Sequence, residues 1–534
     1  MSFQRALRLR SGQAPRERIR PRTPESPGFV ARSLVAALLG ITLAALTGCG
    51  QKPTSGAAAP GIAGSKPSIV LISIDSLRAD HLGCYGYSRS TSPNVDALAA
   101  DGVLFENPVA PAPWTLPSYA SLFTGLYPRT HQTTSITLKG DDAHEPSAPS
   151  KRQKLIYRRL PPKTPTLASS LRAAGYSTHA ILATPLLHAR FGLDAGFDTY
   201  NDDLARIGGR RAHRAVNSPQ VTDAALKALD RLKPPFFLFI HYWDVHYEYL
   251  PPPPFDTRFD PDYPGGLSPA QFLDSRNIAL DSDPRDLQHW VALYDGEIAW
   301  TDEHVGRIIA ELKARGLYDD AIVIFTADHG DAFFEHGLKG HQHSLYQELL
   351  RVPLVVRGPG FQRGRRVAQN VSLVDLMPTL LEIVRAKPPA GVQGRSLLPL
   401  LRGGTLPDRP VFAETTHARK SRSEPRCEAW CMIDGAHKLI VYEPGRYPPE
   451  LYDLAADPLE QRNLGDGPRY AALRARFDQW FQQTPVGVAA AHGEMEDSMK
   501  SGLKALGYLG DQGDEETAAE GEGVADEHEG GDEP

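Results

Sequence analysis

Three short apolar runs constrain the fold of this chain more than any other feature. They are SIVLISID (68–75), FFLFIHYWDVH (236–246) and AIVIFTADHGD (321–331). A short continuous apolar run is typical of a strand buried on both faces, and helical stretches such as PTLASSLRAAG lie between the runs. The pattern predicts an α/β fold in which a central, mostly parallel sheet is sandwiched by helices.

Polar residues follow or close each of these runs. Carboxylates and imidazoles stand at the ends of the three runs: Asp75 in the first, His241, Asp244 and His246 in the second, and Asp328 and His329 in the third. In open α/β sheets, ligands bind at the carboxyl ends of the strands. We therefore expect an active site at this edge of the sheet.

The segment PWTLPSYASLFTGLYP (113–128) contains a further candidate, Thr115. Pro117 is well placed as the first residue of a helix, PSYASLFTG, that Gly125 ends, which leaves Thr115 or Leu116 near the N-cap. The hydroxyl of Thr115 can simply cap the helix. At an anion-binding helix N-terminus beside metal ligands it can instead be a nucleophile, because a metal lowers the pKa of an alcohol. The neighbouring candidate ligands favour the nucleophile.

Five segments together resemble the sulfatase family of the alkaline phosphatase superfamily, in the right order between residue 67 and about residue 465. They are TLPSYASLFTGLYP, FTADHGDAFFEHG, SLYQELLRVPLVVRGPG, VSLVDLMPTLLEIV and ELYDLAADPLEQRNL. The resemblance implies an alkaline-phosphatase-like α/β domain and a smaller C-terminal α+β subdomain with a short antiparallel sheet. It also implies hydrolysis or transfer of a sulfate or phosphate ester at a metal site.

The chain departs from the family signature, which is Cys or Ser, any residue, Pro, any residue, Arg. The equivalent positions here hold Thr115, Pro117 and Tyr119. Threonine cannot become formylglycine, because oxidation of its secondary alcohol gives a ketone, and the arginine is absent. The site therefore resembles the threonine-nucleophile branches, such as nucleotide pyrophosphatase/phosphodiesterases and phosphoethanolamine transferases. Ser76 agrees with this, since sulfatases usually carry a second acidic residue there.

These branches predict an exported, metal-dependent hydrolase that cleaves phosphate esters through Thr115. Three alternatives stay open: a sulfatase acting without formylglycine, a phosphoethanolamine-type transferase, and a noncatalytic ligand-binding relative. The substrate is expected to be a phosphate or sulfate ester, including envelope glycans or lipids.

The resemblance also assigns site roles. Its metal positions fall on Asp75, Thr115, Asp328 and His329, while His246, His341 and Asp244 are candidates for a second ion or for the anionic group. His343 is the alternative to His341. The predicted catalytic residues are Thr115, His246 and His341. Imidazoles mixed with carboxylates favour zinc or manganese, with calcium or magnesium as the second choice.

The N-terminus predicts export. An arginine-rich stretch precedes an apolar run, 34–46, that ends in LTGC. The run is shorter than the about 20 residues that span a bilayer and suits a signal peptide. LTGC resembles a bacterial lipobox, which makes residues 1–49 a lipoprotein-type signal peptide and Cys49 a lipid anchor facing the periplasm. An ordinary cleaved signal is the alternative.

The remaining chain is expected to divide into a linker (50–66), the catalytic domain (67–385), the C-terminal subdomain (386–485), a terminal helical segment (486–510) and a disordered acidic tail (511–534). Without residues 1–49, which hold eight Arg and two acidic residues, the formal net charge changes from −6 to −12, and most of that charge lies in the tail. The rest of the chain is nearly neutral, so we expect no basic surface of the kind that binds nucleic acid. We expect contact with a membrane only through the lipid anchor.

Two further expectations concern the C-terminal subdomain. Cys427 and Cys431, in CEAWC, can form a local disulfide or stay as two free thiols, and both remain open. Arg426, Trp430 and His437 are candidates to reach the cleft.

Overall fold

The three apolar runs form the middle of an eight-stranded sheet. In the computed structural model, which describes residues 66–134, 136–139, 154–206, 217–247, 249–265, 279, 281–421, 423–487 and 492–494, they are neighbouring strands. The strand order is β12 (Arg365–Ser372), β2 (Val103–Val109), β11 (Leu354–Arg357), β8 (Ile322–Ala327), β1 (Ile69–Ile74), β7 (Phe236–Tyr242), β5 (Ser177–Ile181) and β6 (Thr199–Asn201). Only β11 runs antiparallel to its neighbours in this sheet. The predicted mostly parallel sheet is confirmed.

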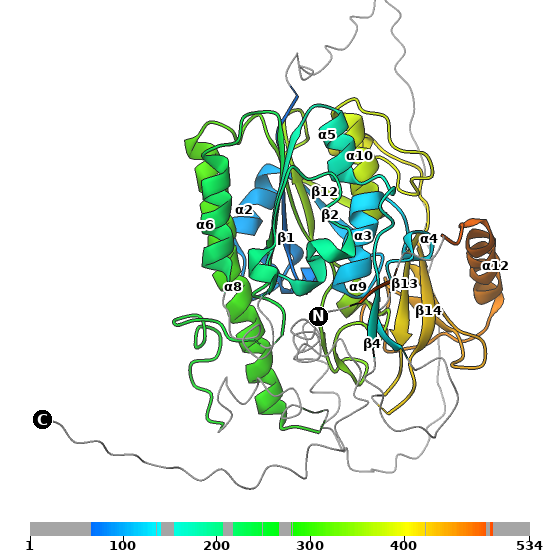
Figure 1. The fold of residues 1–534 in the computed structure, drawn as a ribbon. Helices are drawn as coiled ribbons and strands as arrows, with labels where there is room; N and C mark the ends of the chain where they lie inside the picture. The colour runs from blue at the N-terminus through cyan, green and yellow to red at the C-terminus, as the bar shows by residue number, and fades with distance from the viewer. Residues whose placement is uncertain are drawn as a thin grey trace, which may run out of the picture. The chain divides into compact units, whose positions relative to one another are not determined.

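Helices cover both faces of this sheet (Figure 1). One layer consists of α2 (Pro93–Asp101), α6 (Ser218–Leu229) and α8 (Pro284–Ala314), and the other of α3 (Thr115–Thr124), α5 (Leu167–Ala173) and α10 (Leu376–Ile383). The strands β1, β7 and β8 are buried along their whole length, because helices shield them on both sides.

The strand register brings the predicted site residues to one level. Ile74, the last residue of β1, pairs with Tyr242 of β7 and with Ala327 of β8. Asp75 and Asp328 directly follow β1 and β8, so both carboxylates leave the sheet at the same edge. The Asp75 N–H donates to the Tyr242 carbonyl at 2.9 Å, which continues the ladder by one residue.

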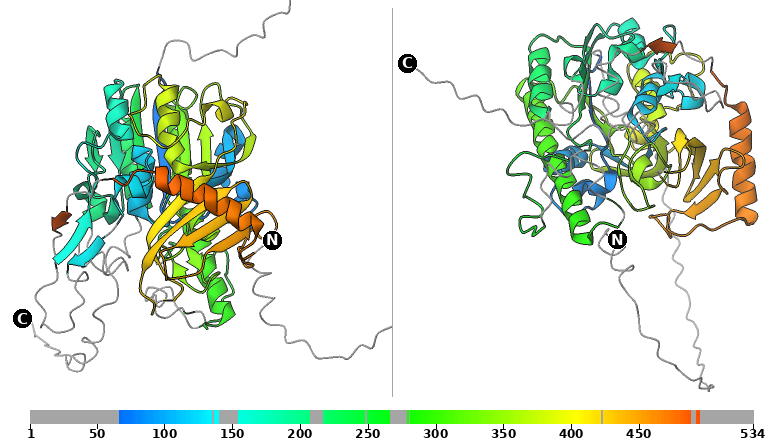
Figure 2. Two further views of the ribbon diagram at one scale, coloured as in Figure 1. Left: turned by 90° about the vertical axis from the view of Figure 1, so that its right-hand side faces the viewer. Right: turned by 60° about the horizontal axis from the view of Figure 1, so that its bottom comes forward.

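A second, antiparallel sheet lies beside this body. It consists of β13 (Val411–Ala418), β14 (Cys427–Asp434), β15 (His437–Tyr442) and β16 (Glu450–Asp453), and α12 (Pro468–Gln483) lies across it (Figure 2). This is the small C-terminal sheet that the resemblance implies.

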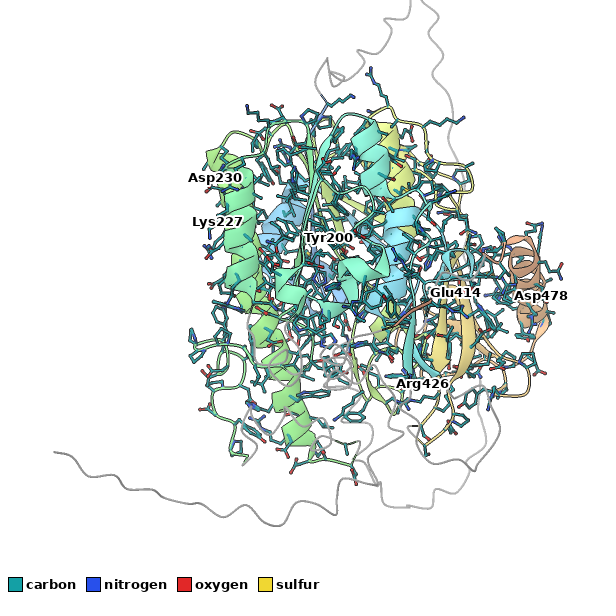
Figure 3. The ribbon with its side chains drawn as sticks, viewed as in Figure 1. Tyr200, Lys227, Asp230, Glu414, Arg426 and Asp478 are labelled. Carbon is teal, nitrogen blue, oxygen red and sulfur yellow. The ribbon has the colours of Figure 1, made fainter. Side chains whose placement is uncertain are left out.

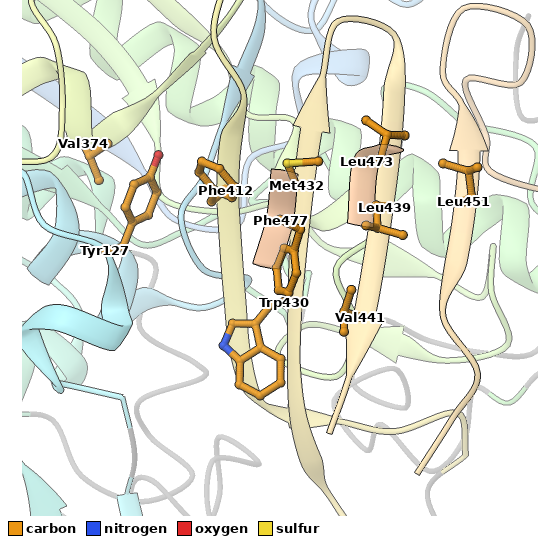
Figure 4. Packing of buried hydrophobic residues seen from close by; sticks show 10 residues of the cluster. All are labelled: Tyr127, Val374, Phe412, Trp430, Met432, Leu439, Val441, Leu451, Leu473 and Phe477. Carbon is orange, nitrogen blue, oxygen red and sulfur yellow. The ribbon is translucent and has the colours of Figure 1, made fainter. Parts of the chain in front are cut away.

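One apolar cluster attaches this sheet to the larger body (Figure 4). Leu473 and Phe477 of α12 pack in the same cluster as side chains from all four strands, and Tyr127 and Val374 join it from the larger body. Burying an apolar side chain of this size contributes about 1.5–3 kcal/mol. The cluster therefore fixes the C-terminal sheet next to the segment that follows α3, where Tyr127 lies.

The remaining elements are short. They are α4 (Pro128–His131), α9 (Gln347–Leu350) and α11 (Leu398–Leu401), the 3-10 turns at Ala79–His81, Gly83–Tyr85, Pro185–Leu187, Ala189–Phe191, Asp203–Arg206 and Leu373–Asp375, and the strands β3 (Ile136–Lys139), β4 (Lys154–Arg158), β9 (Ala332–Phe333), β10 (Lys339–Gly340) and β17 (His492–Glu494).

The chain ends differ in part from the sequence prediction. Within 486–510, predicted to be helical, residues 492–494 form β17, which pairs antiparallel with β4, so the prediction is wrong there. The signal peptide, the linker before residue 66 and the acidic tail lie outside the described residues. In the part of the chain that the structure describes, no helix is both long and apolar enough to cross a membrane.

His336 links the larger body to the C-terminal part of the chain. Its Nδ1 lies 2.7 Å from Glu348 Oε1 and its Nε2 lies 3.1 Å from the Glu460 carbonyl, while its ring stacks on Tyr346. Both partners are acceptors, so both ring nitrogens donate and the ring is an imidazolium. Burial lowers its pKa, but Glu348 and Glu460 outweigh this effect and raise the pKa to about 9.

We expect this imidazolium to make stability depend on pH. Because its pKa is raised on folding, its contribution is fully present below about pH 6.5 and is lost as pH rises through about 9. Relative to His336→Gln, the wild type should lose about 3 kcal/mol of unfolding free energy over that window, at 1.36 kcal/mol per pKa unit. Urea unfolding of both proteins at pH 6 and pH 9.5 measures this difference, and an equal pH dependence would contradict it.

Candidate active site

Thr115 opens α3 and faces the sheet edge. Trp114 occupies the N-cap and Thr115 is the first helical residue, while Gly125, at a φ of 66°, ends the helix as predicted. Thr115 Oγ1 lies 3.2 Å from His329 Nε2. The N-cap position therefore belongs to Trp114, and the Thr115 hydroxyl lies against the candidate ligands.

Asp75 is held by the residue that follows it. Ser76 adopts a left-handed conformation with a φ of 56°, which is uncommon for a residue with a side chain. In this conformation the Ser76 Oγ donates to Asp75 Oδ1 at 3.0 Å, and the Ser76 N–H donates to Asp328 Oδ1 at 3.3 Å. Ser76, in a strained backbone conformation, thus connects the two carboxylates through its hydrogen bonds. Strained residues are often found at functional sites.

His329 completes a three-residue group with these carboxylates. Its Nδ1 lies 2.8 Å from the Gly330 carbonyl, and its Nε2 lies 3.4 Å from Asp328 Oδ2 and 3.6 Å from Asp75 Oδ1. Gly330 is required here because a Cβ would approach the Glu348 carbonyl oxygen to 2.1 Å. Donation from Nδ1 fixes the tautomer in which Nε2 faces the carboxylates with its lone pair.

This group fits a divalent cation. One ligand atom each from Asp75, Asp328 and His329 lies within 4.8 Å of the others, and all three residues are buried. Among the described residues, none hydrogen-bonds Asp75 Oδ2 or Asp328 Oδ2. Two buried carboxylates with unsatisfied oxygens are costly unless they are paired or coordinate a metal.

The charges of the two carboxyl groups are strongly coupled. Burial raises the pKa of Asp75, but the imidazoles of His241, His246 and His329 outweigh this and hold it below its usual value. Burial and the negative charge of Asp75 raise the pKa of Asp328 to about 7. A bound cation would relieve this like-charge repulsion.

A second group of side chains lies next to the first. The rings of His329 and His341 are 4.5 Å apart between centroids, and those of His341 and His246 are 5.0 Å apart. His341 Nδ1 lies 3.1 Å from Asp331 Oδ1, and His246 Nδ1 lies 2.6 Å from the Tyr247 carbonyl. Burial lowers the pKa of both rings, that of His246 to about 3.

The structure separates His341 from its sequence alternative. His343 Nε2 lies 3.1 Å from the Gly340 carbonyl, whereas the ring of His341 packs against both His246 and His329. Of the two, His341 is the one that these ring contacts bring to the candidate site.

Asp244 does not have the geometry of a ligand. Its Oδ1 accepts the Asn217 N–H and its Oδ2 accepts the Ser218 N–H, both at 2.7 Å, at the N-terminus of α6. A carboxylate there satisfies the first amides of a helix and interacts favourably with its dipole. The expectation that Asp244 joins the metal site is corrected to this structural role.

A cavity of about 510 Å³ opens beside the nucleophile helix. Trp114 and Pro117, which flank Thr115 in the sequence, form part of its wall, and Arg129, Arg158, Glu414, Arg426 and Trp430 lie around it. Figure 3 labels Glu414 and Arg426 on the side of the C-terminal sheet. Burial raises the pKa of Glu414 to about 7. The C-terminal sheet therefore supplies one wall of a polar cavity next to Thr115.

The two remaining expectations for the subdomain have different outcomes. Arg426 and Trp430 line the cavity, whereas His437 begins β15 and pairs with Asp453 at 3.8 Å, away from the cavity lining. Cys427 and Cys431 are both free and lie four residues apart in β14. Such residues are about 13 Å apart at 3.3 Å per residue, beyond the reach of a disulfide.

Sequence reasoning missed Asp331, and it placed His241 at the sheet edge without giving it a role in the site. Asp331 accepts from the Tyr249 hydroxyl at 2.5 Å and orients His341. His241 lies within β7, and its Nε2 is 3.4 Å from Asp75 Oδ2. Two features of the sequence could have pointed to them. One is that His241 stands inside an otherwise apolar strand, and the other is that Asp331 is the second aspartate of TADHGD.

Comparisons with known proteins identify the family to which the chain belongs. The Sulfatase family profile matches residues 67–386, and the profile "N-sulphoglucosamine sulphohydrolase, C-terminal" matches residues 335–485. A multifunctional alkaline phosphatase superfamily protein, PehA, from Trinickia caryophylli is 26% identical, covering 78% of this chain and 94% of the relative. A delta 4,5-hexuronate-2-O-sulfatase from Bacteroides thetaiotaomicron is 25% identical, covering 78% and 89%.

Solved structures show the same fold. The phosphonate monoester hydrolase of Agrobacterium radiobacter is 24% identical with a TM-score of 0.62, covering 78% of this chain and 95% of that one. The corresponding hydrolase from Silicibacter pomeroyi gives 24% and 0.61, covering 78% and 94%. The fold and the site thus define a hydrolase of the alkaline phosphatase superfamily. Within it, the chain belongs to the sulfatase family.

We expect the three-residue group to bind a divalent cation and to stabilise the protein when it does. Mn²⁺ or Zn²⁺ at 100 times its dissociation constant should raise the unfolding free energy by about 2.7 kcal/mol, and chelation should remove the gain. Asp328→Asn should abolish the response, which thermal unfolding with and without metal measures.

Asp244→Asn is the matched control. It removes a buried carboxylate of the same size from the helix cap, so it should lower stability and keep the full response to metal. Loss of the metal response in Asp244→Asn, or its retention in Asp328→Asn, would contradict the assignment of the site.

Proposed function

We propose that the protein is a metal-dependent phosphoesterase with Thr115 as its nucleophile, and that phosphate diesters are its preferred class of substrate. The observation that carries the proposal is the position of Thr115 Oγ1, 3.2 Å from His329 Nε2 and beside Asp75 and Asp328. The multifunctional superfamily protein and the phosphonate monoester hydrolases among its relatives support a phosphorus-centred reaction.

A divalent cation held by Asp75, Asp328 and His329 lowers the pKa of a neighbouring alcohol and offsets negative charge that develops during the reaction. The donor set of two carboxylates, an imidazole and a hydroxyl favours zinc or manganese over calcium or magnesium. The first amides of α3 provide further donors for a phosphoryl group, because the amides of a helix's first turn have no intrahelical acceptor.

The proposed hydrolysis has two steps, which the chain's own residues carry out. Thr115 Oγ gives up its proton to solvent and attacks phosphorus, and the bond from phosphorus to the oxygen of the departing alcohol breaks. The negative charge of the bound ester raises the pKa of the imidazoles of His246 and His341. In their protonated form they donate to its oxygens, and one of them supplies the proton that the departing alcohol takes up. Water then cleaves the phosphothreonine, which restores the hydroxyl.

The cavity beside Thr115 is the proposed site for the alcohol part of the ester. Its lining combines Trp114 and Trp430 with arginine and glutamate side chains. This mixture suits a hydroxyl-rich glycan better than an acyl chain, because the charged groups need polar partners. The sulfatases among the relatives, which are named for hexuronate and N-acetylglucosamine substrates, support a sugar at this position.

Removal of the nucleophile tests this function. Thr115→Ala should lower kcat/KM for an aryl phosphate diester by at least about 10³, as loss of a covalent nucleophile does. Intact-mass measurement after rapid quenching should show a covalent phosphoryl adduct in the wild type and none in the variant. Thr124→Ala, which removes a buried threonine hydroxyl from the other end of α3, is the matched control and should keep its activity.

The same assay separates the alternatives. Aryl sulfate cleaved in preference to the phosphate esters would overturn the phosphoesterase proposal in favour of a sulfatase acting without formylglycine. Full activity in Thr115→Ala would overturn the nucleophile. Transfer of the phosphoryl group to an added alcohol acceptor in preference to water would identify a transferase.

We further propose that the protein is a lipoprotein of the bacterial envelope, facing the periplasm. LTGC, ending at Cys49 after an apolar run, supports this localisation. Labelled palmitate fed to expressing cells should be incorporated into the wild type and not into Cys49→Ala. Equal labelling of both proteins would contradict the lipid anchor.

A further inference from the structure

We propose that His241 is a positioning residue for the metal site: its Nε2–H holds the outer oxygen of Asp75 and so orients this carboxylate toward the cation. The inference rests on the proposed function, because it assigns His241 a role only if a cation binds at Asp75, Asp328 and His329. It adds a residue from β7 to a site otherwise built from β1, β8 and α3.

The surroundings of His241 require an explanation. The residue is completely buried within β7, and among the described residues neither of its ring nitrogens has a hydrogen-bond partner. A buried polar group left without a partner costs about 1–3 kcal/mol. Asp75 Oδ2 lies 3.4 Å from Nε2 of this ring. The imidazole is therefore placed next to the one Asp75 oxygen that also lacks a partner.

The two oxygens of Asp75 face different groups. Oδ1 accepts from Ser76 Oγ at 3.0 Å and lies 3.6 Å from Nε2 of His329, one of the three residues whose ligand atoms gather. Oδ2 lies on the side of His241. His241 is not among the three residues whose ligand atoms gather within 4.8 Å. This division favours a hydrogen bond to the carboxylate over direct ligation by His241.

Tyr119 sets the orientation of the His241 ring. The two rings meet edge to face, with centroids 5.4 Å apart and planes at 71°, and the Tyr119 hydroxyl hydrogen-bonds Ser73 Oγ at 2.7 Å. Tyr119 occupies the position where the family signature has arginine. A neutral side chain there brings no donor to the carboxylates, whereas an imidazole N–H from the adjacent strand does.

Metal affinity tests this role directly. Removing a partner that orients a metal ligand typically lowers metal affinity 10- to 100-fold. We expect metal-stripped His241→Ala to bind Mn²⁺ about 10- to 100-fold more weakly than the wild type in calorimetric titration. His241→Gln, whose amide N–H can reach the same oxygen, should bind within about fivefold of the wild type.

A second buried histidine provides the matched control. His131 is also almost fully buried and hydrogen-bonds Ser121 of α3 through Nε2 at 2.9 Å. His131→Gln should therefore lower stability while keeping Mn²⁺ affinity. Thermal unfolding of the metal-free variants shows that each is folded before titration.

A spectroscopic readout distinguishes positioning from ligation. With Co²⁺ bound, His241→Gln should keep the visible absorption bands of the wild type, since the ligand set is unchanged. Altered Co²⁺ bands in that variant, or wild-type Mn²⁺ affinity in His241→Ala, would overturn the positioning role alone. A wild-type protein that binds neither metal would instead overturn the proposed function, and this role with it.

Discussion

The repulsion between Asp75 and Asp328 is the constraint on which the site depends. Two adjacent parallel strands, β1 and β8, deliver both carboxylates to one level of the sheet edge, where neither is exposed to water. Ser76 holds them together in a strained conformation, and His329 faces both. Such an arrangement is costly unless a positive charge lies between the carboxylates. In our account, that charge is a divalent cation, and Thr115 is the group it activates.

The rest of the fold serves to complete the surroundings of this site. α3 brings Thr115 to the sheet edge, and the apolar cluster around Phe412 and Phe477 fixes the C-terminal sheet against the segment that follows α3, where Tyr127 lies. That sheet contributes Glu414 and Trp430 to the cavity. The chemistry thus depends on the central sheet, and the shape of the neighbouring cavity depends partly on the smaller one. Because the two sheets contribute different parts of the site, proteins that share one fold can differ in substrate. The similar proteins accordingly include a phosphonate monoester hydrolase and a hexuronate sulfatase.

The central sheet could be predicted from the sequence because its strands are buried on both faces and read as continuous apolar runs. The same runs predicted the placement of Asp75, Asp328 and His329 at one edge, since parallel strands end together. Asp244 could not be assigned in this way. It follows the same strand as His246, and only the position of α6 shows that its oxygens cap a helix.

Contacts between side chains that are distant in the sequence could not be predicted from the sequence either. The contact of Asp331 with His341, and the approach of His241 to Asp75, join segments 10 or more residues apart through the packing of loops and strands. The Cys427–Cys431 question was settled only when both residues were placed in one extended strand.

Anomalous diffraction from crystals grown with Mn²⁺ tests the central claim most directly. Our account predicts a strong manganese peak at about 2.0–2.2 Å from oxygens of Asp75 and Asp328 and from His329 Nε2, with Thr115 Oγ1 completing the ligand set. A peak that excludes these residues, or well-ordered Asp75 and Asp328 side chains with no manganese between them, would contradict it.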